Sequence, residues 1–237
     1  GINAVFDGGY VNLNPGEYGE LLTIDKPLTL QAKYLYTDST IITDEFSTYA
    51  EFDSVNGQTI QIASHDVTIN GLSIRRVNDV SFKKHAAIGN RNYPDLYNIS
   101  ITNCSIDSIY DGIYLNKIDH VFLYNNNNIS SDTIGVYLNT VNNSLLFHNH
   151  LDKLDNSGIK AINCYGLVID NNSFSNKINE AIEIQDSELG IITNSQFYNN
   201  SDSILLNDST EFVIINSNFT KNENAISLFG SSISFIE

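Results

Sequence analysis

The sequence contains no tryptophan and no methionine, and it has only three prolines and two cysteines among its 237 residues. It has no run of 18 apolar residues, so we expect no membrane-spanning helix and no direct membrane insertion. The two cysteines, Cys104 and Cys164, are too few for a disulfide framework or a cysteine-based metal motif, and free, partly buried thiols are expected. Lysine and arginine total 12 against 28 acidic residues. This net charge of −16 argues against nucleic-acid binding, which needs clustered cations on phosphates.

Asparagine is the most unusual excess, with 33 residues in the chain. It disfavours helix interiors and strands but tolerates left-handed turn positions, so this content predicts many repeated turns. Hydrophobic residues make up 41% of the chain, which is a globular composition and not a disordered one. The strong negative charge suits an extracellular or cell-surface setting, or one rich in divalent cations.

One pattern recurs: hydrophobic, any, hydrophobic, any, Asn, any, any, hydrophobic. It occurs as ISITNCSI (99–106), LLFHNHL (145–151, one residue short), LVIDNNSF (167–174), GIITNSQF (190–197) and FVIINSNF (212–219), with a less regular copy at 121–129. The asparagines expected to form a ladder at one turn are Asn103, Asn125 or Asn126, Asn149, Asn171, Asn194 and Asn216.

A second pattern, a small residue followed by hydrophobic, any, hydrophobic, runs in phase with the first. It begins at GIYL (112–115) and ends at AISL (225–228), and its copies are 22 or 23 residues apart. The short alternating segments have strand periodicity, and 22–23 residues hold three short strands and three turns. Two markers with one period therefore predict an all-β solenoid, a single parallel β-helix with an asparagine ladder at one turn.

These motifs resemble the repeats of the pectate-lyase-like right-handed β-helix superfamily, most closely its carbohydrate-binding and sugar-hydrolase-type or copper-maturation-type members. The turn PGEY (15–18) before the strand KPLTL (26–30) looks like the opening coils of that superfamily, and VTINGLSI (67–74) continues them. The resemblance covers essentially the whole chain and implies a right-handed helix. It specifies the fold better than the function, because one fold serves many functions.

We expect one domain over 1–237, with irregular coils over 1–98, a basic insertion near 75–97 and regular coils over 99–237. Solenoid ends normally carry caps, and no amphipathic capping helix is evident at either end. The sequence therefore predicts that the chain is joined to other domains of a larger protein, or that copies stack on its ends.

The resemblance places ligand sites on the outer face of the GIYL-type strands. Tyr114 and Tyr137, on adjacent coils, are expected to form an aromatic shelf for sugar rings, with Asn116 and Asn139 beside it. Lys160 and Glu183 follow in the same outward row and are expected to form an ion pair. A solvent-facing stack of ordinary strand residues is the competing interpretation.

Other candidate residues lie outside this row. Asp186 and Asp208 are equivalent turn residues that could share a Ca²⁺ ion or form a carboxylate pair of the retaining-glycosidase kind, with ordinary turn chemistry as the competing interpretation. The basic insertion could bind an anion through Arg75, Arg76, Lys83, Lys84 and Arg91. His148 and His150 flank Asn149, but a copper site would need further ligands.

The signatures of the pectinolytic enzymes of this superfamily are missing, and no arginine follows Arg91. We identify no catalytic residue and expect no cofactor, Ca²⁺ apart. The preferred hypothesis is a non-enzymatic extracellular or cell-surface module: a spacer, an adhesin or a surface-layer component that could bind a polysaccharide. The alternatives are a polysaccharide lyase or glycoside hydrolase acting along the first strand, and a periplasmic metal-processing relative.

Overall fold

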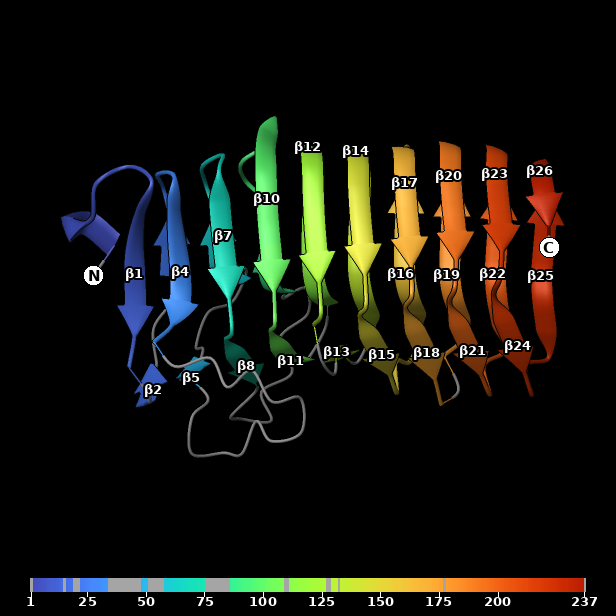
Figure 1. The fold of residues 1–237 in the computed structure, drawn as a ribbon, viewed down its shortest axis with the longest axis horizontal. Helices are drawn as coiled ribbons and strands as arrows, with labels where there is room; N and C mark the ends of the chain where they lie inside the picture. The colour runs from blue at the N-terminus through green and yellow to red at the C-terminus, as the bar shows by residue number, and fades with distance from the viewer. Residues whose placement is uncertain are drawn as a thin grey trace.

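The computed structural model describes residues 2–14, 16–18, 22–33, 48–50, 58–75, 86–108, 111–126, 129–131, 133–176 and 178–236. These residues wind into a right-handed parallel β-helix, with the N-terminal coils at one end of the stack and the C-terminal coils at the other (Figure 1). The all-β fold and its three strands per regular coil confirm the prediction. The helical part of these ranges is the 3-10 turn η1 (Ile2–Ala4), and none of them holds an apolar helix of membrane-spanning length.

The strands form parallel β-sheets on three faces of the helix. We number the faces in the order in which the chain passes through them within each coil. Face one contains β3 (Leu22–Ile24), β6 (Gln58–Ile62), β9 (Ala86–Gly89), the first halves of β12 (Asp111–Tyr124) and β14 (Ile134–Phe147), β16 (Ser157–Ile162), β19 (Glu180–Gln185), β22 (Asp202–Asn207) and β25 (Asn224–Phe229).

Face two contains β1 (Gly9–Leu13), β4 (Leu28–Ala32), β7 (Val67–Asn70), β10 (Leu96–Thr102), the second halves of β12 and β14, β17 (Tyr165–Asp170), β20 (Glu188–Thr193), β23 (Thr210–Ile215) and β26 (Ile233–Ile236). Face three contains β8 (Ser73–Arg75), β11 (Ser105–Ser108), β13 (Ile129–Ser131), β15 (His150–Asp152), β18 (Ser173–Ser175), β21 (Gln196–Tyr198) and β24 (Asn218–Thr220). A separate pair joins β2 (Gly16–Tyr18) to β5 (Thr48–Ala50).

The core consists of inward columns of stacked side chains. On face one, Ile113, Val136, Ile159, Ile182 and Ile204 pair in register and are 0–1% exposed. On face three, the ring of Phe197 stacks on Phe174 and Phe219 with centroid distances of 5.0 and 4.9 Å. Each such side chain, when fully buried, stabilises the fold by about 1.5–3 kcal/mol.

The predicted asparagine ladder lies at the second corner, between faces two and three. The buried Asn149 Oδ1 accepts from the backbone N–H of Asn126 at 3.1 Å, and Asn172 Oδ1 accepts from that of Asn149 at 2.8 Å. Cys104 starts this inner column, and Ser195 and Ser217 continue it after Asn172. Each coil is thereby tied to the next through a satisfied buried amide or hydroxyl.

The membership of this ladder differs from the predicted one at several positions. The buried column contains Asn126 and Asn149 as expected, together with Asn172. The residues one place earlier, Asn103, Asn125, His148, Asn171, Asn194 and Asn216, adopt left-handed backbone angles with φ of 50–58°. Two of them still form an amide ladder as predicted, outside the buried column: Asn125 Nδ2 donates to Asn103 Oδ1 at 2.7 Å, and Asn103 Nδ2 donates to Asn70 Oδ1 at 2.8 Å. The sequence could not separate the two positions because asparagine suits both a left-handed turn and an inward amide ladder.

Candidate functional site

The outward row of face one follows the predicted order. Tyr114 pairs with Tyr137 across β12 and β14, and Tyr137 pairs with Lys160 of β16. Lys160 pairs with Glu183 of β19, and Leu205 and Ser227 continue the row on β22 and β25. The parallel register therefore gathers residues from six coils into one line, with neighbours roughly 4.8 Å apart.

The two tyrosines form the predicted aromatic shelf. Their rings stack with centroids 4.9 Å apart and planes 11° from parallel. Burial is the main cause that raises the pKa of the Tyr137 phenol, with Tyr114 the next contributor, so the phenol remains a neutral hydrogen-bond donor at physiological pH.

Arg91 extends this shelf at its N-terminal end. Its guanidinium lies over the Tyr114 ring, 4.4 Å from the centroid, which is a cation–π arrangement. It also lies 3.4 Å from Asp111 Oδ2. The sequence assigned Arg91 to an anion-binding insertion, whereas the structure attaches it to the tyrosine row and pairs it with an acid.

Sequence analysis missed Asp111, the first residue of β12. Its side chain is 7% exposed, and Thr133 Oγ1 donates to its Oδ1 at 2.8 Å. Burial raises its carboxyl pKa, although Thr133 and Arg91 act in the opposite direction. The signal available in the sequence was its position at the start of a GIYL-type strand, equivalent to Ser157, Glu180 and Asp202 in later coils.

Lys160 and Glu183 form the predicted ion pair, with Nζ 2.7 Å from Oε1. Ser157 Oγ donates to Glu183 Oε2 at 2.9 Å and lies 3.5 Å from Glu180 Oε2, so it contacts both carboxylates. Burial is the main cause that raises the pKa of Glu180, followed by the charges of Glu183 and Asp202. Carboxylates thus outnumber cations in this part of face one.

The predicted amides lie where face one turns toward face two. Asn139 Nδ2 donates to Asn116 Oδ1 at 3.0 Å, which links the two coils. The fully buried Asn90 accepts from the backbone N–H of Asn116 and donates to its carbonyl oxygen. These bonds hold the amides in fixed positions at the edge of the tyrosine shelf.

The basic insertion is only partly described. Arg76, Lys83 and Lys84 lie outside the described residues, so their place relative to a ligand remains a prediction. Arg75 ends β8 on face three, and Arg91 reaches the outer side of face one. The structure therefore separates the two arginines that it describes.

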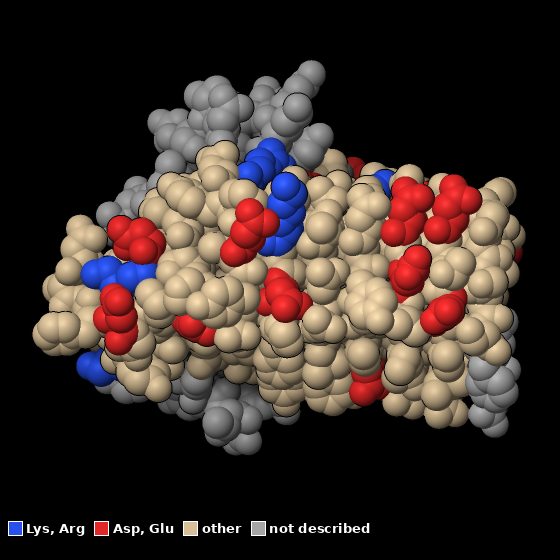
Figure 2. Space-filling model, turned by 90° about the horizontal axis from the view of Figure 1, so that it is seen from above, with Lys and Arg blue, Asp and Glu red and all other residues tan. Residues whose placement is uncertain are grey.

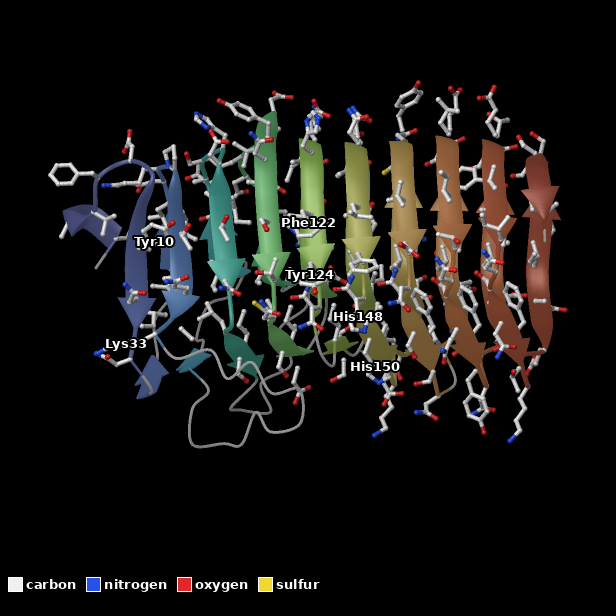
Figure 3. All side chains as sticks on the ribbon, viewed as in Figure 1. Tyr10, Lys33, Phe122, Tyr124, His148 and His150 are labelled. Carbon is white, nitrogen blue, oxygen red and sulfur yellow. The ribbon has the colours of Figure 1, made fainter. Side chains whose placement is uncertain are left out.

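Asp186 and Asp208 are exposed residues of the first corner, between faces one and two, and both adopt left-handed angles, with φ of 48° and 47°. Gln185 Nε2 donates to Asp186 Oδ2 at 3.0 Å. Within the described ranges, no group of three or more His, Cys, Asp or Glu side chains could hold a metal ion. His148 and His150 lie at the second corner and on β15 (Figure 3).

The first corner also contains a groove of about 760 Å³ between β10 and β14. Tyr97, Ile118 and Asn142 belong to its lining, together with Lys117 and His120. The groove lies beside the tyrosine row and does not include it.

The chain belongs to the right-handed β-helix family, because the family model described as the right handed beta helix region matches residues 89–237, more than half of the chain. This confirms the right-handed parallel β-helix that the resemblance to the pectate-lyase-like superfamily implied. A search of curated proteins by sequence found no match.

Solved structures show the same fold. The A-module of the mannuronan C-5 epimerase AlgE4 of Azotobacter vinelandii gives a TM-score of 0.72 at 12% identity, over 97% of this chain and 68% of that one. Pectin methylesterase PemA of Erwinia chrysanthemi gives a TM-score of 0.54 at 12% identity, over 98% of this chain and 82% of that one. The enzymatically active domain of tailspike protein 2 of bacteriophage CBA120 gives 0.52 at 12% identity, and this chain spans only 39% of it.

Proposed function

We propose that this chain is a non-enzymatic, extracellular or cell-surface β-helix module that binds a glycan along the outer row of face one. The observation that carries the proposal is the stacked pair Tyr114–Tyr137, a flat aromatic surface of the kind on which sugar rings stack. Asn116 and Asn139 add amides at its edge. The structural neighbours named above include enzymes that act on mannuronan and pectin, which supports a glycan-related role.

The charges beside the shelf favour an uncharged glycan over an acidic one. Arg91 is paired with Asp111 and Lys160 with Glu183, so both cations of the row are already neutralised. Glu180 and other carboxylates add negative charge, which would repel a uronate. The proposed ligand is therefore a neutral polysaccharide, and the role of the module is attachment or spacing.

Titration calorimetry against neutral and uronate polysaccharides, preceded by a glycan array, tests the proposal. We expect binding to a neutral glycan. A Tyr114→Ala/Tyr137→Ala variant should lose at least tenfold in affinity, about 1.4 kcal/mol, because it lacks the aromatic surface on which the sugar rings stack. Tyr165→Ala, which removes an aromatic ring that is 47% exposed at the first corner, is the matched control. Unchanged affinity in the double variant would exclude the shelf as the binding surface.

One observation favours a glycoside hydrolase as the second candidate. Glu180 and Glu183 both contact the Ser157 hydroxyl, and a raised pKa such as that of Glu180 is a property of the general acid in a catalytic pair of carboxyl groups. A reducing-end assay on the same polysaccharides tests this candidate. Product release that disappears in Glu180→Gln would establish hydrolysis and overturn the non-enzymatic proposal.

A further inference from the structure

The groove at the first corner exposes one flat face of the Tyr97 ring. His65, one coil earlier, stacks on the other face, with ring centroids 4.4 Å apart and planes 10° from parallel. On the next coil Tyr97 pairs with Asp119, which in turn pairs with Asn142. Both of these side chains are much shorter than a tyrosine, so the phenol ring stands above them and is 42% exposed. The ring face that His65 does not cover is therefore a wall of the groove, and Asp119 and Asn142 belong to its floor.

A hydrogen-bond network holds the two stacked rings in place. Asp66 Oδ1 accepts from Asn98 Nδ2 at 2.7 Å, and Asp66 Oδ2 lies 2.7 Å from His65 Nδ1. The bond from Asn98 is the main cause that lowers the pKa of the Asp66 carboxyl, followed by the bond from His65. Because an ionised carboxylate can only accept, His65 Nδ1 is the donor of that bond. Asn98 directly follows Tyr97, so the network fixes the ring before a ligand arrives and lowers the entropy cost of binding.

The rest of the groove offers hydrogen-bond donors and acceptors around this ring face. Asp119 accepts from Asn143 Nδ2 at 2.8 Å and lies 3.1 Å from His120 Nδ1, and a carboxylate has lone pairs left after two such bonds. The Lys117 ammonium group adds donors. A ring that stacks on Tyr97 turns its edge toward these groups, so the ligand needs hydrogen-bonding groups around that edge. A pyranose meets this requirement, because its hydroxyls surround an apolar C–H face that suits an aromatic ring.

The charges of the groove favour a neutral ligand. Asp95 and Asp119 are carboxylates of its lining, and Lys117 is the permanent cation among the lining residues that the structure describes. Figure 2, which looks onto the first corner from above, shows more acidic than basic side chains on this side of the molecule. A uronate or a nucleotide would bring further negative charge to this surface and would be repelled. A flat hydrocarbon ring would leave the polar groups of the lining without partners, which costs binding energy.

We propose that this groove is a glycan-binding site, in which one sugar residue of a neutral polysaccharide stacks on the exposed face of Tyr97. The volume of about 760 Å³ lies within the usual range of ~300–1,000 Å³ for small-molecule sites. The described lining contains neither Tyr114 nor Tyr137, so the site is separate from the shelf on face one and does not depend on it. It is the weaker of the two sites, because it has one stacking ring where the shelf has two.

Titration calorimetry on the full chain carrying Tyr114→Ala/Tyr137→Ala isolates the groove. The probes are cellohexaose, mannohexaose and xylohexaose, with hexagalacturonate as the acidic comparison. We expect a neutral probe to bind at one site per chain, and hexagalacturonate to bind more weakly. Adding Tyr97→Ala should lower the affinity at least about tenfold, because it removes the stacking face. Tyr198→Ala, which removes a ring of the same 42% exposure on face three, is the matched control and should leave the affinity unchanged.

Two further positions separate ring stacking from a general loss of structure. Asp119→Leu places an aliphatic side chain against the exposed face of Tyr97 and should block binding although the ring is still present. His65→Ala should weaken binding roughly threefold, because the Tyr97 ring loses its support, whereas His65→Phe keeps a ring behind it and should retain the affinity. Circular dichroism verifies that each variant folds.

The outcomes distinguish the groove from the shelf. Failure of every neutral probe to bind, or equal affinity with and without Tyr97→Ala, would overturn the groove site. Tighter binding of hexagalacturonate would overturn the neutral class of ligand. If the unmodified chain binds these probes and the Tyr114→Ala/Tyr137→Ala chain does not, the shelf is the binding surface and the groove is refuted. If binding survives the shelf substitutions unchanged and is lost in Tyr97→Ala, the groove is supported and the shelf is refuted.

Discussion

Phe212 fills the space that a side chain at Gly190 would occupy. The two residues are partners on β20 and β23, and a Cβ built on Gly190 would overlap the Phe212 ring. Phe212 is fully buried, so its ring cannot move outward without losing core contacts. We therefore expect Gly190→Val to destabilise the protein by about 1–3 kcal/mol, the usual cost of overpacking. Urea denaturation would measure the change.

The compensating variant provides the control. Phe212→Val alone should also destabilise the core, by leaving a cavity of unfilled volume beside Gly190. Combined with Gly190→Val, it places two medium-sized side chains in the same space, so the double variant should be more stable than the sum of the single effects predicts. If the double variant instead loses the sum of the two single changes in unfolding free energy, the two residues do not share this space.

The amide ladder gives a second stability prediction, at Asn149. Its Oδ1 accepts from the backbone and side chain of Asn126, and its Nδ2 donates to Leu123 O and to Asn172 Oδ1. Asn149→Ala leaves these buried groups unsatisfied and should cost roughly 3 kcal/mol. Asn149→Ser should recover part of the loss, because Ser195 Oγ accepts from the Asn172 N–H in the same column. Equal thermal midpoints for the two variants would argue against the ladder's role.

The fold could be predicted from the sequence because a solenoid repeats its local rules. The 22–23-residue spacing alone aligned Tyr114 with Tyr137 and Lys160 with Glu183, since parallel register converts a sequence period into spatial neighbours. The ladder was less certain, because Asn171 and Asn172 are adjacent and both turn positions accept asparagine. Only the direction of each side chain, which the backbone sets, separates them.

The site was predicted less completely than the fold. Asp111 was missed because its burial and its contact with Arg91 depend on a residue 20 positions away, outside the repeat. The outward direction of Phe122 and Val168 on face two was missed because both lie in segments where inward and outward residues are hydrophobic. Periodicity cannot assign a face when the pattern does not alternate.

Glu180 gives a prediction for the pH dependence of stability. Burial, with Glu183 and Asp202, raises its pKa above the ordinary 4.5, so the folded state binds this proton more tightly than the unfolded state. That stabilisation is complete below the ordinary pKa and is lost as the pH rises through the raised folded value. Glu180→Gln should therefore be as stable as the wild type below the ordinary pKa and more stable than the wild type at neutral pH, as measured by urea midpoints. Glu188→Gln, at an exposed position, is the control for removing one carboxylate from the surface.

The two cysteines give a prediction about access to the core. Cys104 and Cys164 are free and buried, and burial raises the pKa of each thiol to about 11. Since the thiolate is the reactive form, neither side chain should react with Ellman's reagent near pH 8 while the chain is folded. Adding urea should expose two thiols per chain in a single transition that coincides with the loss of strand signal in circular dichroism. Labelling of either cysteine at low urea would reveal that the corner containing this cysteine opens locally before global unfolding.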